Sequence, residues 1–145
     1  MEMIIENGGL PPNFEKINNA FHVAGQAVLF CYGDIICNPY GVEIPPQLIK
    51  HEEVHSRQQG SDVEGWWDKY IEDPEFRWEQ ELEAHVVEWK EYCKRHGGDK
   101  RIAYLKIVAE RLSSPIYGQM RTYEQCRDAI LTYKRKNGVM EHELA

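Results

Sequence analysis

The stretch His51-Glu52-Glu53-Val54-His55 constrains the fold more than any other part of the sequence. In a helix, residues four apart lie one turn apart on the same face, so this spacing brings the imidazoles of His51 and His55 together. Two imidazoles placed in this way can share one zinc ion, and the carboxylate of Glu52 lies beside them as a base for water activated by the metal. Such a site needs a helix whose motif face points inward and a further ligand from a second element.

The sequence sets the limits of the motif helix. Pro45-Pro46 opens it, because proline is tolerated in the first turn, and Gly60 ends it. On a helical wheel, both histidines share one face with an apolar residue and with two further polar residues. The members of this face are Leu48, His51, Glu52, His55 and Gln59. We therefore expect the motif to face the interior of the protein.

A catalytic zinc site needs a third protein ligand, and a second long helix can supply it. This helix is predicted over residues 74–96, because Asp73-Pro74 is a typical N-cap and first helical residue and Gly97-Gly98 is a typical end. Four of its glutamates are candidate ligands: Glu79, Glu81, Glu83 and Glu88.

The apolar stripe of this second helix is centred near Trp78 and Trp89 and selects among the four glutamates. Glu81 lies on the flank of the stripe, next to His85. Glu83 lies well outside it, and Glu79 and Glu88 fall at its margins. A ligand must face the core side of its helix, so Glu81 is the expected third ligand, with Glu83 and Glu79 as alternatives.

The combination of His51-Glu52-x-x-His55 with a downstream helix carrying Glu81-Leu82-Glu83-Ala84-His85 resembles the gluzincin class of zinc metallopeptidases. That class commonly carries Glu-x-x-x-Asp on its second helix, where Glu is a zinc ligand and Asp supports a ligand histidine. The resemblance gives Glu81 the ligand role and puts His85 in the Asp position, where it cannot supply a negative charge. It covers residues 26–90, and it extends to small bacterial and phage proteins of metallopeptidase type.

The resemblance implies a zinc-dependent hydrolase that cleaves peptide bonds, with Glu52 as the general base. Gluzincins often stabilise the oxyanion with a Tyr or His. Tyr117, in the loop 113–118, is the candidate for that role, with His85 and His96 as alternatives. The class also usually sets an edge strand above the cleft, for which residues 28–44 are the candidate.

Two other functions remain open. One is a catalytically inactive metal-binding or structural protein of a phage or bacterium on the same zincin scaffold. The intact Glu52 argues against it, since an inactive protein has no chemical need for that carboxylate. The other is a helical interaction module in which the motif has no function.

The rest of the pattern predicts one α+β domain over residues 1–145, mainly helical and zincin-like. Residues 1–20 are expected to be irregular, with only weak support for a helix near 15–24. Strands at 26–32 and 35–38 form a hairpin, and 42–44 is a candidate further short strand.

About four helices are expected after this small sheet, with the motif helix first. Residues 60–73 are predicted to be a linker or short helix, and a third helix is predicted over 101–112. Thr122 and Gln125 form a capping box that begins a last helix running to about Lys136, and residues 137–145 are expected to be a frayed tail.

Composition narrows the partners. The formal net charge of −7 argues against binding to a nucleic-acid backbone, and no apolar run approaches the length of a membrane span. A peptide or protein substrate is the expected partner. The N-terminus lacks a secretory hydrophobic region, so we expect a cytoplasmic protein, or one associated with a virion or released by lysis. The four cysteines are expected to be reduced packing thiols, with a Cys31–Cys37 pair across the hairpin as the alternative.

Overall fold

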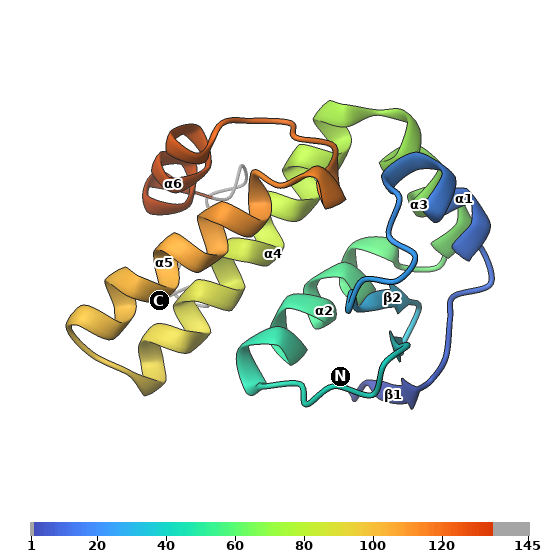
Figure 1. Ribbon diagram of the computed structural model, residues 1–145, viewed down its shortest axis with the longest axis horizontal. Coiled ribbons are helices and arrows are strands. Elements are labelled where there is room, and N and C mark those ends of the chain that lie inside the picture. The colour runs from blue at the N-terminus through green and yellow to red at the C-terminus, as the bar shows by residue number, and fades with distance from the viewer. Residues whose placement is uncertain (1, 135–145) are drawn as a thin grey trace.

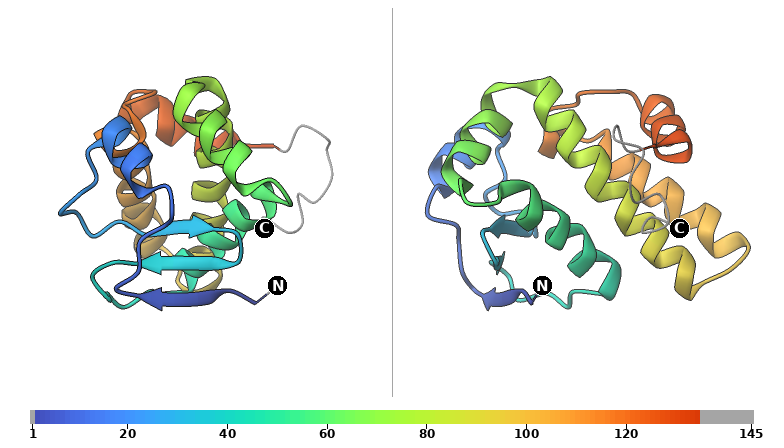
Figure 2. Two further views of the ribbon diagram at one scale, coloured as in Figure 1. Left: turned by 90° about the vertical axis from the view of Figure 1, so that its right-hand side faces the viewer. Right: turned by 180° about the vertical axis from the view of Figure 1, so that it is seen from behind.

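The computed structural model describes residues 2–134, which form a mainly helical α+β fold with a small three-stranded sheet (Figures 1 and 2). The elements in chain order are β1 (Ile4–Asn7), α1 (Phe14–Phe21), β2 (Phe30–Tyr32), β3 (Ile35–Asn38), α2 (Pro46–Gln59), α3 (Val63–Glu72), α4 (Pro74–Arg95), α5 (Asp99–Leu112), the 3-10 turn η1 (Pro115–Tyr117) and α6 (Tyr123–Thr132).

The sheet has the order β1-β3-β2, with β1 parallel and β2 antiparallel to β3. Gly33 turns the β2–β3 hairpin with a positive φ of 64°, a conformation that glycine adopts without strain. The prediction that residues 1–20 are irregular is wrong for β1, whereas α1 forms close to the weakly supported helix predicted near 15–24. All four residues of β1 are exposed, so the sequence of this strand shows no alternation of buried and exposed positions. Its position is set by pairing with β3.

Two further strand predictions need correction. The first hairpin strand is shorter than expected, since only Phe30–Tyr32 pairs with β3. Residues 42–44 form no strand. Asn38 instead holds this stretch through its side-chain amide, which donates to the carbonyl of Val42 at 2.8 Å and accepts from the Val42 N–H at 3.2 Å.

The predicted helices at the motif, at 74–96 and at 101–112 are confirmed within a few residues. Five helices follow the sheet instead of about four, because the stretch 60–73, predicted to be a linker or short helix, forms the helix α3, capped by the Asp62 side chain. The capping box of Thr122 and Gln125 is present, but α6 ends at Thr132, before the expected Lys136. The predicted tail 137–145 lies outside the described residues.

Helix α2 lies between the sheet and α4 (Figures 1 and 2), and it packs on both. Two apolar clusters flank this central pair of helices. The first joins α1, the β2–β3 hairpin and α3, and the second joins α4, α5 and α6. The faces of α2 and α4 that meet between the clusters are polar, and they hold the motif.

Two composition-based predictions can be compared with this fold. All four cysteines are free, which confirms the expected thiols, and Cys31, Cys37 and Cys126 are buried. Among the described helices, none combines the length and the hydropathy needed to cross a bilayer.

Candidate metal centre

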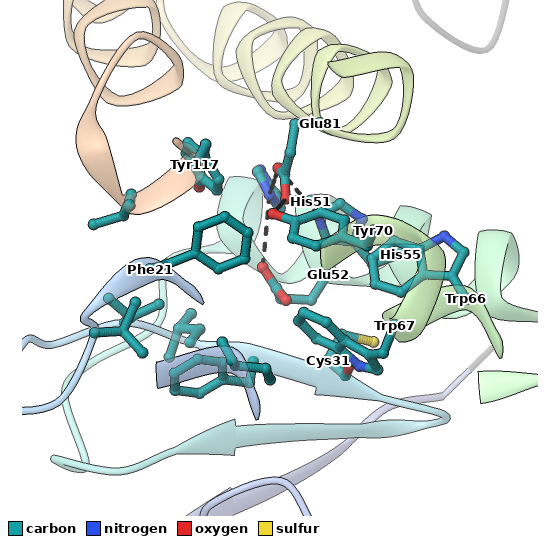
Figure 3. Close-up of a pocket in the computed structure, with 16 residues that line it drawn as sticks. Phe21, Cys31, His51, Glu52, His55, Trp66, Trp67, Tyr70, Glu81 and Tyr117 are labelled. Carbon is teal, nitrogen blue, oxygen red and sulfur yellow. Dashed lines mark hydrogen bonds and ion pairs between the residues drawn. The ribbon is translucent and has the colours of Figure 1, made fainter. Parts of the chain in front are cut away.

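The structure brings together the three side chains that the sequence nominated as ligands. Helix α2 directs His51 and His55 toward α4, where Glu81 faces them (Figure 3). Glu81 Oε1 lies 3.5 Å from His51 Nε2 and 3.3 Å from His55 Nε2. All three residues are buried, and their ligand atoms lie within 4.8 Å of one another. These groups could therefore hold a metal ion.

The two separations from Glu81 Oε1 to the histidine nitrogens fit a tetrahedral zinc ion. Zinc bonds of about 2.0–2.1 Å to nitrogen and oxygen in tetrahedral geometry place neighbouring ligand atoms about 3.3–3.4 Å apart. The two measured separations from Glu81 Oε1 are close to that value. Two imidazoles and one carboxylate also form a donor set typical of catalytic zinc, which leaves a fourth position open.

Hydrogen bonds on the far side of each imidazole orient the ligand nitrogens. His51 Nδ1 is 2.8 Å from Glu88 Oε1, and His55 Nδ1 is 2.8 Å from Gln58 Oε1. Each partner atom is an acceptor, so each Nδ1 carries the proton of the bond. In the neutral imidazole the Nε2 lone pair is then free and points at Glu81, as a metal ligand requires.

The orientation of Gln58 is itself fixed. Its amide nitrogen donates to the backbone carbonyl of Gln80 at 3.1 Å and to Glu83 Oε1 at 3.0 Å. The amide oxygen must therefore face His55. Glu83 also accepts from Arg57 at 2.6 Å, and Glu79 is exposed, so neither alternative ligand joins the cluster.

Burial and neighbouring charges act on the pKa values of the cluster in opposite directions. Burial lowers the pKa of His51, but hydrogen bonds to Glu81 and Glu88 outweigh it and raise the pKa to about 10. For Glu81, burial raises the pKa, but the adjacent histidines dominate and hold it well below its usual range. Without a metal, a proton on His51 therefore balances the Glu81 carboxylate. Tyr70 fixes this carboxylate by donating to Glu81 Oε2 at 2.6 Å.

Glu52 lies beside the donor set, with Oε2 3.7 Å from His51 Nε2. Burial raises its pKa, although the nearby histidines act against that rise. Among the described residues no Lys or Arg forms an ion pair with Glu52, and His51 is its ion-pair partner. If a metal held His51 as a neutral imidazole, Glu52 would have no cationic side chain beside it, and the metal would have to compensate its buried charge.

Glu88 supplies the anionic partner that the resemblance assigns to position 85. Its carboxylate accepts hydrogen bonds from His51 Nδ1 and from the Tyr104 hydroxyl, the latter at 2.6 Å. It also accepts one from each terminal guanidinium nitrogen of Arg111, at 2.7 and 2.8 Å. Sequence analysis left Glu88 at the margin of the apolar stripe. A search for residues two helical turns from Glu81 would have found it, because positions i and i+7 share a face.

His85 bonds to Glu81, the nominated ligand one turn before it on α4, through the backbone. Its Nδ1 bonds to the backbone carbonyl of Glu81 at 2.7 Å, so that nitrogen carries the proton. Its Nε2 is buried and has no hydrogen-bond partner among the described residues. Burial, together with the nearby His51, lowers its pKa to about 3, so the ring is neutral. His51, His85 and Glu88 form a second group within metal-binding distance, but Arg111 already neutralises its carboxylate.

Tyr117 reaches the same centre from η1. Its ring lies 5.2 Å from that of His85 in an edge-on contact, and it lines a cavity with His51, Glu52 and Glu81 (Figure 3). Burial and the Glu81 charge raise its pKa well above the usual value, so the phenol stays protonated. Arg77 holds this segment by donating to the Tyr117 carbonyl at 2.8 Å. His96, the other alternative, ends α4 and stacks on Tyr92.

Similarity to known proteins adds nothing to this geometry. Comparison with protein-family models, with curated protein sequences and with solved structures gave no match. The functional conclusion therefore rests on the residues themselves.

Proposed function

We propose that the protein is a zinc-dependent hydrolase that cleaves peptide bonds, with zinc held by His51, His55 and Glu81. The observation that carries this proposal is Glu52, a buried carboxylate beside the donor set that has no Lys or Arg partner among the described residues. A purely structural zinc site has no use for it, since such sites close with four protein ligands. Three donors and an adjacent base are the composition of a hydrolytic site.

Each residue has a role that its contacts support. Zinc in this donor set supplies Lewis-acid activation of water and of a substrate carbonyl. Glu52 accepts a proton from the attacking water and returns it to the leaving amine. Tyr117, kept protonated by its surroundings, donates to the substrate oxygen as negative charge develops there. Tyr70 and Glu88 hold Glu81 and His51 in place.

Metal content is the first test. We expect about one zinc per chain by elemental analysis of the untagged protein, and loss of zinc from the His51→Ala and Glu81→Ala variants. Glu83→Ala is the matched control on the same helix and should keep its zinc. A wild-type protein without zinc, even after zinc is added, would contradict the proposal.

Replacing the base tests catalysis separately from binding. Glu52→Gln should keep zinc, while hydrolysis of a mixed peptide library falls by about 100-fold or more, since general-base catalysis contributes about 10²–10⁴-fold. Glu53→Gln, a neighbour that pairs with Lys50 at 3.4 Å, is the control and should retain activity. Equal hydrolysis by the wild type and Glu52→Gln would remove Glu52 from the mechanism. Zinc binding without any hydrolysis would leave a metal-binding protein.

A further inference from the structure

The cavity beside the metal centre has one polar wall and several apolar walls. His51, Glu52, His55 and Glu81 form the polar wall (Figure 3). The other walls come from α1, from β2 and the residues before it, from α3 and from η1, and most are aliphatic or aromatic. Any group that enters this cavity therefore lies against apolar surface on one side and against the reacting groups on the other.

Three of the aromatic side chains that line the cavity already use their polar atoms in hydrogen bonds within the protein. Trp66 Nε1 donates to Gln80 Oε1 at 2.8 Å, and Trp67 Nε1 donates to the carbonyl of Cys31 at 3.1 Å. The Tyr70 hydroxyl is engaged with Glu81. These three rings thus present apolar surface to an occupant, which favours a hydrocarbon group over a polar one.

Size limits the occupant further. The cavity volume is about 50 Å³. An apolar cavity of roughly 150 Å³ accepts benzene, and a single water needs roughly 10–15 Å³. A cavity of the present size is too small for an aromatic ring but admits a few non-hydrogen atoms, as in a short aliphatic side chain.

Phe21 lines this cavity from the end of α1. The helix stops after it because His22 adopts a left-handed conformation with φ of 54°. Its ring packs edge-on against Tyr70, with centroids 5.9 Å apart, and lies 4.9 Å from the Arg77 guanidinium. Arg77 in turn binds the backbone carbonyls of Tyr70 and Tyr117. This wall is braced on two sides and cannot retreat cheaply from a larger group.

We propose that this cavity is a specificity subsite for a short aliphatic side chain, such as that of Ala or Val, next to the scissile bond of the substrate. Phe21 is the residue that excludes aromatic side chains. The inference rests on the proposed peptidase function, because it assigns the cavity to a substrate residue adjacent to the reacting carbonyl.

A binding series tests the subsite without turnover. The probes are acyl hydroxamates with methyl, isopropyl, isobutyl and benzyl groups, which chelate zinc and place the variable group beside it. Their affinities for the zinc-loaded protein are measured by calorimetry. We expect the isopropyl compound to bind at least about tenfold more tightly than the benzyl compound, the scale on which apolar pockets discriminate by size.

Replacing Phe21 tests the assignment of the size limit. Phe21→Leu, and Phe21→Ala if that variant folds, should tighten benzyl binding by about tenfold or more and remove the preference. Tyr123→Ala is the control, because Tyr123 is an aromatic residue that packs against the α4–α5–α6 cluster and does not line the cavity. It should leave the ranking unchanged.

The outcomes separate this inference from the proposed function. Equal affinities across the series, or a ranking that both Phe21 variants leave unaltered, would overturn the subsite even if peptides are cleaved. The expected ranking in a protein that binds zinc but cleaves no peptide would support the cavity's selectivity and overturn the peptidase proposal alone.

Discussion

The two sides of α4 are built from opposite kinds of side chain. Toward α2 it presents Glu81, His85 and Glu88, which are between 0% and 3% exposed. Toward α5 and α6 it presents Val86, within an apolar cluster completed by Leu105, Val108, Ala109, Leu112, Cys126 and Ile130. A single helix thus supports an ionisable interface and a hydrocarbon interface of similar burial.

The two sides of α4 contribute differently to the stability of the fold. Apolar burial contributes roughly 25 cal/mol per Å², so the α4–α5–α6 side stabilises the fold directly. Buried ionisable groups contribute little net stability, because desolvation offsets their attraction, and removing one partner is costly. The α2–α4 side is therefore the place where a bound cation changes the energetics most. Four predictions test this division, from the largest expected effect to the smallest.

Zinc should stabilise the protein through the α2–α4 side. At a free zinc concentration of about 1,000 times the dissociation constant, we expect the free energy of unfolding to rise by about 4 kcal/mol. Denaturant titrations with zinc and with a chelator measure this difference. Glu81→Ala should lose most of the rise, whereas Glu83→Ala should keep it. A similar rise in both variants would place the zinc elsewhere.

Truncating a side chain on the α5–α6 side of α4 should lower the free energy of unfolding but leave zinc affinity unchanged. Leu112 is fully buried, so Leu112→Ala should lower the free energy of unfolding by about 2–5 kcal/mol. Its zinc affinity, measured by chelator competition where the variant is folded, should stay within about twofold of the wild type, since Leu112 belongs to an apolar cluster that includes none of the three nominated ligands. A tenfold loss of affinity would show that the two sides of α4 are coupled.

The carboxylate behind His51 should tune metal affinity. Glu88→Gln keeps an acceptor for His51 Nδ1 but removes the negative charge, and partners of this kind contribute about 10–100-fold to affinity. We expect a loss in that range by chelator competition. Glu91→Gln, the same change on the same helix at a residue paired with Lys94 and Arg95, should leave affinity unaltered.

The neutral partner behind His55 should have a smaller effect. Gln58→Leu removes the acceptor for His55 Nδ1, and we expect a loss of zinc affinity below about tenfold, because no charge is lost. Gln59→Leu is the contrasting variant. Gln59 accepts from the Gly33 N–H and donates to the Cys31 carbonyl, so its loss should lower stability by about 1–3 kcal/mol without weakening zinc binding.

The parts of the fold that the sequence predicted are those with a local signal. Helical period and capping residues located α2, α4 and α5, and the inward face of α2 followed from the wheel. Strand β1 was missed because its exposed residues carry no pattern and its partner lies about 30 positions away. Helix α3 was left open between a linker and a short helix, because the glycines of that stretch weaken the helical pattern, although Asp62 caps it.

In the candidate site, too, the residues with a local sequence signal were predicted, and the contacts that depend on helix packing were not. His51, Glu52 and His55 follow from a single motif, and the choice of Glu81 follows from one helical wheel. The pairing of His51 with Glu88, and of Glu88 with Arg111, depends on how α2, α4 and α5 meet. The spacing from Glu81 placed His85 where the resembled class has the Asp that supports a ligand histidine. In the structure, His85 Nδ1 donates to the backbone carbonyl of Glu81.

The two walls of the site also differ in how far apart their residues are in the sequence. The donor set joins His55 to Glu81 across a separation of 26, through the short helix α3, so closing that loop costs little chain entropy. The proposed substrate cavity also needs Phe21 and Tyr117, whose positions in the sequence differ by 96 (117 − 21). Non-local contacts of this kind form slowly. We therefore expect that, during refolding, the zinc-binding donor set forms before the cavity that would select the substrate side chain.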